Sequence, residues 1–239
     1  ARINAVIPPR TNAIFTNPED CKKIISLLAK RHIGYTREEI SEETNIPFGG
    51  GLTNTLNALI ESDFVQKYNP YNTHGKVVRY KLIDNFCLFW LKYVDENVHK
   101  SDFMTENISS EILKSWRGVA FEELCWQHIN PIKRALGING ISSSLSAWSV
   151  KGDDNKEGVQ IDLLITRNDN VVNLCEMKFA GDTYTIDKEE DAKLRNRIET
   201  LKQTLSAKQS VHLTMITTFG VTYGKYSGIV QKEVTMDDL

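Results

Sequence analysis

Four polar residues in the second half of the chain, Gln160, Asp162, Glu176 and Lys178, have types and spacing suited to metal and phosphate chemistry. Glu176 and Lys178 are two apart in a strand-like run, so their side chains should project from one face of a sheet. The turn cluster at 168–170 predicts a hairpin centred on residue 169, which pairs residues whose numbers sum to 338, twice 169. The sequence therefore predicts Asp162 opposite Glu176 and Gln160 opposite Lys178.

Two interpretations of this set differ in their chemistry. Carboxylates facing each other across neighbouring strands lie about 5 Å apart and repel by roughly 3 kcal/mol at an effective dielectric near 20. A divalent cation, Mg²⁺ or Mn²⁺, would offset that repulsion, and Lys178 beside it could stabilise an attacking water or a developing phosphate charge. Alternatively, Lys178 neutralises Glu176 and the set lies on a solvated sheet face.

A further acid, Glu122, falls on a helical stripe with Val119, Trp126 and Ile129, where the spacing calls for an apolar side chain. An acid in such a stripe usually has a partner. The alternative is that Glu122 lies at the edge of the stripe and reaches water, and Glu123 beside it favours an ordinary helix surface.

Periodicity predicts the elements that would position these residues. In the second half we expect helices at 110–129 and 188–205, and strands at 141–150, 159–166, 171–180, 211–217 and 228–234. The order helix, three strands, helix, strand is typical of an α+β or α/β domain with a mixed central sheet.

The first half has the pattern of a winged helix-turn-helix. We expect helices at 20–31, 36–44 and 52–62, followed by a hairpin of strands at 64–68 and 77–82. Thr36 and Glu39 predict a capping box at the second helix. The aromatic stretch 86–94 is interpreted as a helix packed between modules rather than a cofactor site, because no glycine or paired polar group accompanies it.

The length and composition of the chain indicate its number of domains and the setting in which it folds. The 239 residues suit two domains, which we place at 19–98 and 110–239 after a linker at 1–18. Four scattered cysteines, with no C-x-x-C pair, predict buried free thiols and a reducing, cytoplasmic setting. No histidine has zinc-ligand spacing, and no stretch indicates a signal peptide, a membrane span or a membrane partner.

The balance of basic and acidic residues gives no sign of a surface that binds nucleic acid. The net charge is −2, and residues 1–110 hold 13 basic and 13 acidic residues. The third expected helix has no basic residue, although Asn54 and Asn57 could contact bases. Four residues, Lys67, Lys76, Arg79 and Lys81, could make the hairpin basic. The better phosphate candidates, Lys193, Arg195, Arg197 and Lys202, lie on the long helix, where Glu189, Glu190 and Glu199 offset them.

Together these residues resemble a known family. A helix with Gly118, Phe121 and Glu122, then Gln160 to Asp162, then Glu176 to Lys178, resembles the restriction-endonuclease-like PD-(D/E)XK nuclease superfamily. The stretches YKLID at 80–84 and VTMDDL at 234–239 are similar to the C-terminal half of archaeal and bacterial AAA-like ATPases, which carry a winged helix and a DEXX-box nuclease-like domain. This resemblance covers nearly the whole chain.

The resemblance implies an α+β fold in which a winged helix-turn-helix precedes a restriction-endonuclease-like α/β/α domain with a mixed sheet. It makes Asp162 and Glu176 metal ligands for Mg²⁺ or Mn²⁺, Lys178 the catalytic lysine, and Glu122 and Gln160 auxiliary residues. Ile161 departs from the proline of the family's motif, and Gln160 stands where relatives often carry an acid.

The function implied is a magnesium-dependent DNA phosphodiesterase attached to a nucleotide-driven switch. No G-x-x-x-x-G-K-[ST] loop occurs, so ATP would bind only in an upstream ATPase domain that this chain lacks. The alternative is a non-catalytic regulatory or interaction region, in which the nuclease-like fold is inactive and the winged helix docks on the ATPase or on a partner protein.

Overall fold

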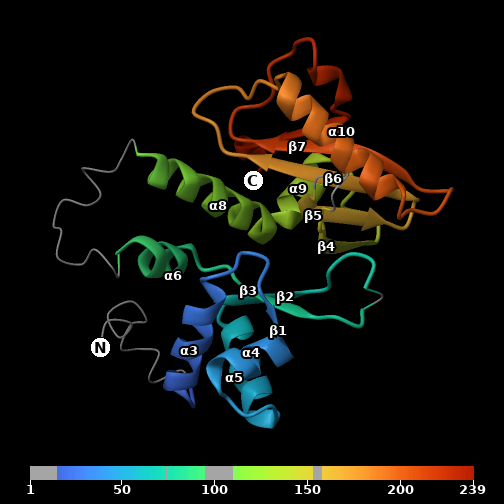
Figure 1. The fold of residues 1–239 in the computed structure, drawn as a ribbon. Coiled ribbons are helices and arrows are strands. Elements are labelled where there is room, and N and C mark those ends of the chain that lie inside the picture. Colours follow the sequence, from blue (N-terminus) through green and yellow to red (C-terminus); the bar gives the residue numbers. More distant parts are fainter. Residues whose placement is uncertain (1–14, 74, 95–109, 153–157) are drawn as a thin grey trace. The chain divides into compact units, whose positions relative to one another are not determined.

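The computed structural model describes residues 15–73, 75–94, 110–152 and 158–239 of an α+β protein (Figure 1). The chain divides into two units, residues 1–69 with 75–116 and residues 70–74 with 117–239. The division falls inside helix α8 (Glu111–Gln127), after Trp116. The boundary expected at 99–109 and most of the linker expected at 1–18 lie outside the described residues.

The first unit contains helices and a small antiparallel sheet. Its elements are α3 (Pro18–Leu28), β1 (Tyr35–Thr36), α4 (Arg37–Thr44), α5 (Gly50–Glu61), β2 (Val65–Tyr68), β3 (Arg79–Leu82), α6 (Asn85–Phe89) and the π-helical turn η1 (Trp90–Val94). The strand order is β1-β3-β2. The expected helices and hairpin are present, whereas β1, only two residues long, was not predicted.

Local sequence accounts for where these helices begin. Asn17 caps α3 with its side chain, and Pro18 occupies the first helical turn. The capping box predicted at α4 is confirmed: the Glu39 N–H donates to Thr36 Oγ1 at 3.2 Å, and the Thr36 N–H donates to the Glu39 carboxylate at 2.6 Å. The core of the unit includes Phe15 and the inward residues of α3 and α5, Ile24, Ile25, Leu28, Leu52, Leu56 and Leu59.

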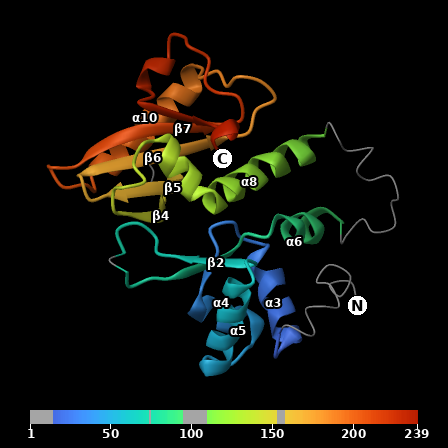
Figure 2. The same ribbon diagram turned by 180° about the vertical axis from the view of Figure 1, so that it is seen from behind.

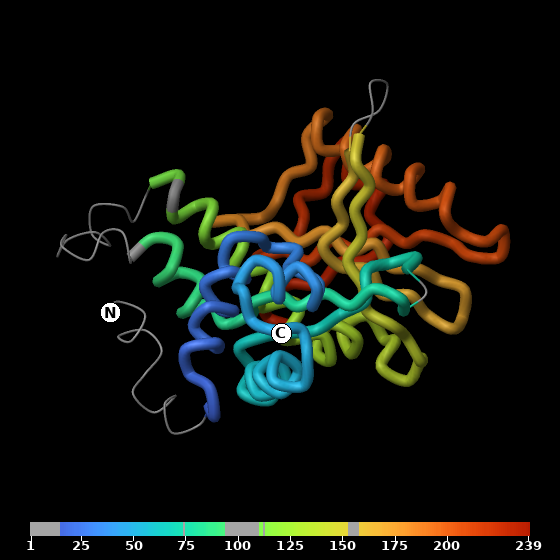
Figure 3. Tube along the Cα trace, turned by 60° about the horizontal axis from the view of Figure 1, so that its bottom comes forward, coloured from blue at the N-terminus to red at the C-terminus, as the bar shows by residue number. Residues whose placement is uncertain are grey.

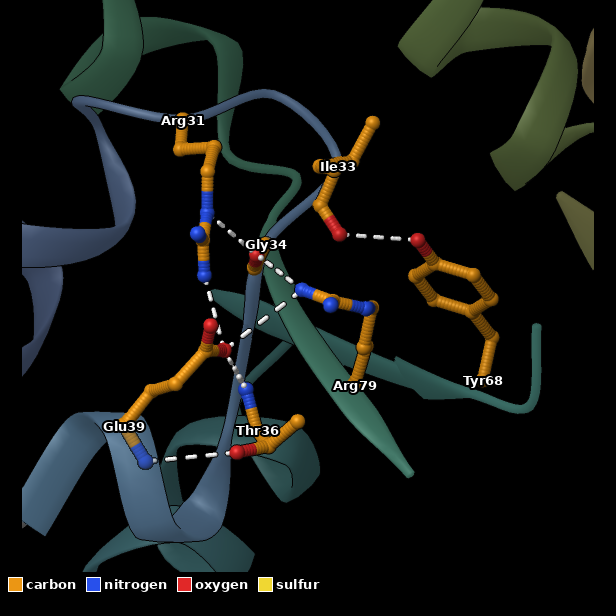
Figure 4. A network of polar contacts seen from close by, with 7 residues as sticks. All are labelled: Arg31, Ile33, Gly34, Thr36, Glu39, Tyr68 and Arg79. Carbon is orange, nitrogen blue, oxygen red and sulfur yellow. Dashed lines mark hydrogen bonds and ion pairs between the residues drawn. The ribbon is translucent and has the colours of Figure 1, made fainter. Parts of the chain in front are cut away.

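Glu39 also joins a network around the turn that leads into β1 (Figure 4). Its carboxylate lies 2.7 Å from Arg31 and 3.5 Å from Arg79, and both arginines donate to the Gly34 carbonyl, at 2.9 and 3.0 Å. Partial burial alone would raise the pKa of Glu39, but the Arg31 hydrogen bond, the Thr36 N–H and the two arginine charges outweigh it and lower that pKa.

The turn itself requires glycine. Gly34 has φ +70°, and a Cβ there would lie 2.1 Å from the Tyr80 carbonyl oxygen. The backbone of β3 therefore approaches the turn so closely that no side chain fits.

The second unit is built on a five-stranded mixed sheet. Its elements are α8, α9 (Ile129–Ala135), β4 (Ser143–Val150), β5 (Val159–Arg167), β6 (Val171–Lys178), α10 (Lys188–Lys202), β7 (Ser210–Thr217), β8 (Lys232–Thr235) and the short 3-10 turns η2 (Ser227–Ile229) and η3 (Met236–Asp238). The strand order is β4-β5-β6-β7-β8; β4, β5 and β6 are antiparallel, and β7 and β8 continue parallel to β6. The mixed sheet is confirmed, and α9 is an additional helix.

Helices cover both faces of this sheet (Figures 1 and 2). The core on the α10 side includes Ile161, Leu164, Leu174, Leu194 and Leu201. The core on the side of α8 and α9 includes Phe121, Trp126, Leu163, Ile165 and Cys175. Whether a strand residue belongs to one core or the other shows which helices its side chain faces.

Figure 3 traces the described residues from the N-terminal to the C-terminal half of the chain. Two further expectations, on the cysteines and on membrane-spanning helices, can be compared with the structure. All four cysteines, Cys21, Cys87, Cys125 and Cys175, are buried free thiols, as predicted. No helix in the described ranges is long and apolar enough to cross a membrane.

Candidate functional site

The register of the β5–β6 hairpin is the one predicted from the sequence. Leu163 pairs with Cys175 and Thr166 with Val172, so the residue numbers sum to 338. Asn170 adopts φ +65° in the turn, a conformation that asparagine tolerates. The recorded pairs end at Leu163 and Cys175, which makes Asp162 and Glu176 the next positions at this end of the two strands.

A β-bulge lies at Asp162. On the other side of β5, Ser146 pairs with Leu164, but Trp148 pairs with Ile161, so Asp162 and Leu163 together oppose one residue of β4. Ile161 consequently joins the core on the α10 side, whereas strict alternation from Leu163 would place it on the other side. The period-two argument that put the Asp162 and Glu176 side chains on one face therefore fails at Asp162.

The bulged Asp162 is held by neighbours from β5 and α8. Gln160 Nε2 donates to Asp162 Oδ1 at 2.7 Å, and Trp126 Nε1 donates to the Asp162 carbonyl at 3.0 Å. A carboxylate oxygen of Glu122 lies within 4.8 Å of one on Asp162. Glu122 and Trp126 are four apart on α8, which places both on the helix surface that meets the bulge.

The burial of α8 corrects one expectation. Glu123, interpreted as ordinary helix surface, is fully buried, while Glu122 is only partly buried. The α8 residues buried in the core on this side of the sheet include Phe121, Cys125 and Trp126, and at 100° per residue Glu122 falls between Cys125 and Trp126 around the helix. Glu122 therefore lies on the apolar stripe, where it is partly buried and has its carboxylate near that of Asp162.

Glu176 has a different set of partners. Arg197 Nη1 of α10 donates to Glu176 Oε2 at 2.6 Å, and Lys178 Nζ lies 3.0 Å from Glu176 Oε1. The Glu176 side chain is only 11 % exposed. Each oxygen of this nearly buried carboxylate thus has its own cationic partner, which offsets the cost of removing the charge from water.

Lys178 is shared between two acids. Its Nζ lies 3.0 Å from Glu190 Oε1 as well as from Glu176, and 5.9 Å from the centre of the Tyr184 ring. Burial alone would lower the pKa of Lys178, but the two carboxylates outweigh it and raise that pKa above its usual range. Lys178 is therefore a permanent cation at neutral pH, suited to stabilising negative charge rather than to accepting a proton.

The pKa of Tyr184 is shifted by burial and by the same charged groups. Burial raises its pKa to about 12; the Lys178 charge opposes this shift, and the carboxylates of Glu190 and Glu176 add to it. Tyr184 is consequently a neutral phenol at physiological pH.

The predicted site residues thus form two groups at one end of β5 and β6. The first contains Gln160, Asp162 and Glu122, and the second contains Glu176 and Lys178, joined by Arg197, Glu190 and Tyr184, which were not predicted there. In the described part of the chain, no hydrogen bond or ion pair joins Asp162 to Glu176. A metal site shared by these two residues stays a prediction.

The α10 residues of the second group had a recognisable pattern. Glu190, Leu194, Arg197 and Leu201 follow helical spacing on the stripe whose leucines are fully buried. A charged side chain on that stripe must meet a polar partner on the sheet, as Arg197 meets Glu176. The polar-face interpretation of α10 overlooked this stripe.

The first group fits a divalent cation by its donor set. Two carboxylate oxygens within 4.8 Å of each other match the preference of Mg²⁺ for one or two carboxylates plus water. At an effective dielectric near 20 these charges repel by roughly 3 kcal/mol, less where water screens them. A cation between Glu122 and Asp162 would remove that repulsion.

The candidate nucleic-acid residues are dispersed. Asn54 and Asn57 are exposed on α5. On α10, Lys193 pairs with Glu189, Arg195 with Asp191 and Lys202 with Glu199 along the helix surface. Of the four residues that could make the hairpin basic, Lys81 is 4 % exposed and Arg79 is held by Glu39 and Gly34, whereas Lys67 and Lys76 are exposed.

Comparison with known proteins gives no family. No family model matches the chain, and neither does any curated protein. A solved structure, "Crystal Structure of Protein of Unknown Function AF1548", aligns with 43 % of this chain at 19 % identity and a TM-score of 0.30. The alignment spans about half of that protein, 53 %, and no inference about fold or function rests on it.

Proposed function

We propose that the second unit is a Mg²⁺- or Mn²⁺-dependent phosphodiesterase domain of the PD-(D/E)XK nuclease type, acting on DNA. The observation that carries the proposal is the Glu122–Asp162 carboxylate pair, at the same end of β5 and β6 as Glu176 and Lys178. The element order also supports it, because a helix, three antiparallel strands, a crossover helix and a parallel strand are what the resemblance implies.

Each residue has a role in this proposal. Asp162 and Glu122, whose carboxylate oxygens lie within 4.8 Å of each other, would hold the cation, which would supply Lewis-acid activation of water and phosphate. Glu176 would position Lys178 beside the site. Gln160 orients Asp162 through the 2.7 Å hydrogen bond. Lys178, a permanent cation, stabilises negative charge on the phosphate as the bond to its oxygen breaks.

For the first unit we propose the winged helix-turn-helix of the same resemblance, with α5 as the second helix of the motif. The three helices and the β1-β3-β2 sheet support this topology. The exposed Asn54 and Asn57 would contact DNA only weakly, because α5 carries no basic residue. On this proposal the chain acts with an AAA-like ATPase domain, which would bind ATP.

A nicking assay on supercoiled plasmid, titrated with Mg²⁺ or Mn²⁺, tests the nuclease proposal. We expect divalent-dependent nicking by the wild-type chain and none by Asp162→Asn. Glu199→Gln is the matched control, since it removes a carboxylate from α10 that is 67 % exposed and pairs only with the surface Lys202. Equal nicking by wild type and Asp162→Asn would refute the assigned site.

A second candidate function is a non-catalytic interaction module with an inactive nuclease-like fold. The observation favouring it is that Arg197 and Lys178 together neutralise Glu176 and Glu190, so the second group has no net charge without a metal. This candidate predicts no nicking and no change in thermal stability on adding Mg²⁺ to the wild type.

A further inference from the structure

We propose that Phe179 stacks against an unpaired base of the substrate, so that the proposed site prefers single-stranded DNA over duplex DNA. This inference rests on the proposed phosphodiesterase function and narrows its substrate class. It gives a role to an exposed aromatic side chain that neither the Glu122–Asp162 pair nor Lys178 uses.

Phe179 lies beside both groups of the candidate site. It directly follows Lys178, the last residue of β6, and its ring centre lies 6.2 Å from that of Phe121 on α8, with the ring planes at 66°. Phe121 is buried and immediately precedes Glu122 in the helix. The contact with Phe121 places the Phe179 ring on the α8 side of the sheet, where the carboxylates of Glu122 and Asp162 approach each other.

The Phe179 ring reaches solvent from a backbone that is held on both sides. The residue is 40 % exposed, although its ring contacts the core. On one side of it, Lys178 pairs with Thr217 of β7, and on the other the Ala180 N–H donates to Thr218 Oγ1 at 3.0 Å. A ring already fixed in position loses little conformational freedom when a flat partner binds, so more of the contact energy appears as affinity.

The chemistry of this edge favours a base over a phosphate backbone. Phe219, 57 % exposed, follows the end of the neighbouring parallel strand β7 by two residues. By contrast, three basic residues of α10 pair with acids of the same helix, and the net charge of the chain is −2. Duplex DNA is bound mainly through its phosphates, whereas a single strand offers base faces that stack on aromatic rings. The exposed rings therefore fit the single strand better.

Binding of fluorescent oligonucleotides, measured by anisotropy with Ca²⁺ in place of Mg²⁺, tests the inference on the full chain. The probes are a single strand, the same strand paired with its complement, and a strand of equal length whose bases are replaced by abasic sugars. Phe179→Leu keeps an apolar side chain but removes the ring. Phe86→Leu is the matched control, because Phe86 is 59 % exposed on α6 and belongs to the first unit.

Wild type should bind the single strand about tenfold more tightly than the duplex or the abasic strand, the scale of one stacked base. Phe179→Leu should bind the single strand about tenfold more weakly than wild type and the abasic strand equally well, while Phe86→Leu binds both as wild type does. Because no phosphate contact is lost, the effect of Phe179→Leu should be the same from about 50 to 200 mM salt. Phe179→Trp, with a larger ring, should bind the single strand more tightly and replaces Phe179→Leu if that variant does not fold.

Three results overturn the inference while leaving the proposed function intact, provided that wild type still nicks plasmid with Mg²⁺. The first is equal affinity of wild type for the single strand and the abasic strand. The second is unchanged affinity for the single strand in a folded Phe179 variant. The third is a wild-type dimer, seen by light scattering, that Phe179→Leu dissociates without changing DNA affinity, since the ring then belongs to a protein interface. Absence of divalent-dependent nicking by wild type refutes the proposed function itself, and the inference with it.

Discussion

Replacing Asp162 by asparagine should stabilise the protein without metal and destabilise it, relative to wild type, with metal. The substitution removes a charge that lies within 4.8 Å of a carboxylate oxygen of Glu122. The full repulsion is roughly 3 kcal/mol at an effective dielectric near 20. Because both side chains are only partly buried, water screens the charges, and we expect a gain of about 1 kcal/mol.

The packing around the substitution should survive. Asparagine has the same shape, and its Oδ1 can still accept the hydrogen bond from Gln160. The Trp126 bond goes to the main-chain carbonyl and does not depend on the side chain. A stability change in Asp162→Asn therefore reports the charge rather than a lost contact.

Thermal unfolding with and without Mg²⁺ measures the effect. A gain of about 1 kcal/mol raises the midpoint by roughly 2 to 4 °C in a chain of this size. At a Mg²⁺ concentration of about 100 times Kd, wild type gains about 2.7 kcal/mol by mass action, whereas Asp162→Asn gains little. The order of the two midpoints should therefore reverse when Mg²⁺ is added.

Asp169→Asn is the control for the direction of the stability change. Asp169, in the β5–β6 turn, accepts from Arg167 Nε at 2.9 Å, and that hydrogen bond lowers the pKa of Asp169. Removing the negative charge beside Arg167 should destabilise the unit equally with and without Mg²⁺. The reasoning is refuted if Asp162→Asn is less stable than wild type in the absence of metal, or if both respond equally to Mg²⁺.

Two further predictions concern the first unit. Gly34→Ala should prevent folding of this unit, since a Cβ would lie 2.1 Å from the Tyr80 carbonyl oxygen. Gly75 also has positive φ but has open space around it, so Gly75→Ala should lower the free energy of unfolding by only about 1 to 2 kcal/mol. Thermal melts followed by circular dichroism compare the two variants. Glu39 has a lowered folded-state pKa, so the stability it contributes is complete above the unfolded-state value near 4.5 and is lost as pH falls through the folded-state value. Acid titrations of wild type and Glu39→Gln should therefore differ in slope below about pH 4.5, and identical slopes would contradict this assignment.

The parts of the fold that were predictable depend on local chemistry. The turn cluster at 168–170 set the register of β5 and β6, and the Thr36–Glu39 pair set the start of α4. In both cases the decisive contacts join residues close in sequence. Such contacts can be deduced from spacing and residue type alone.

The parts that were not predictable depend on contacts between distant segments. The short strand β1 exists because β3, more than forty residues later, pairs with it. The bulge at Asp162 and Leu163 depends on pairing with β4, and the apolar run that follows Asp162 shows no alternation from which it could be deduced. The ion pair between Arg197 and Glu176 required knowing which stripe of α10 covers the sheet.

The bulge at Asp162 also bears on how such a site is inherited. Its extra residue, rather than the identity of the aspartate, decides which way that side chain faces. Deleting one residue from β5, or inserting one into β4 at Ala147, would restore the alternation and turn Asp162 away from Glu122 while leaving every letter of the motif in place. A descendant of this sequence could therefore keep the complete pattern of acids and lysine and have lost the geometry, so gaps between related sequences here would carry as much information as substitutions.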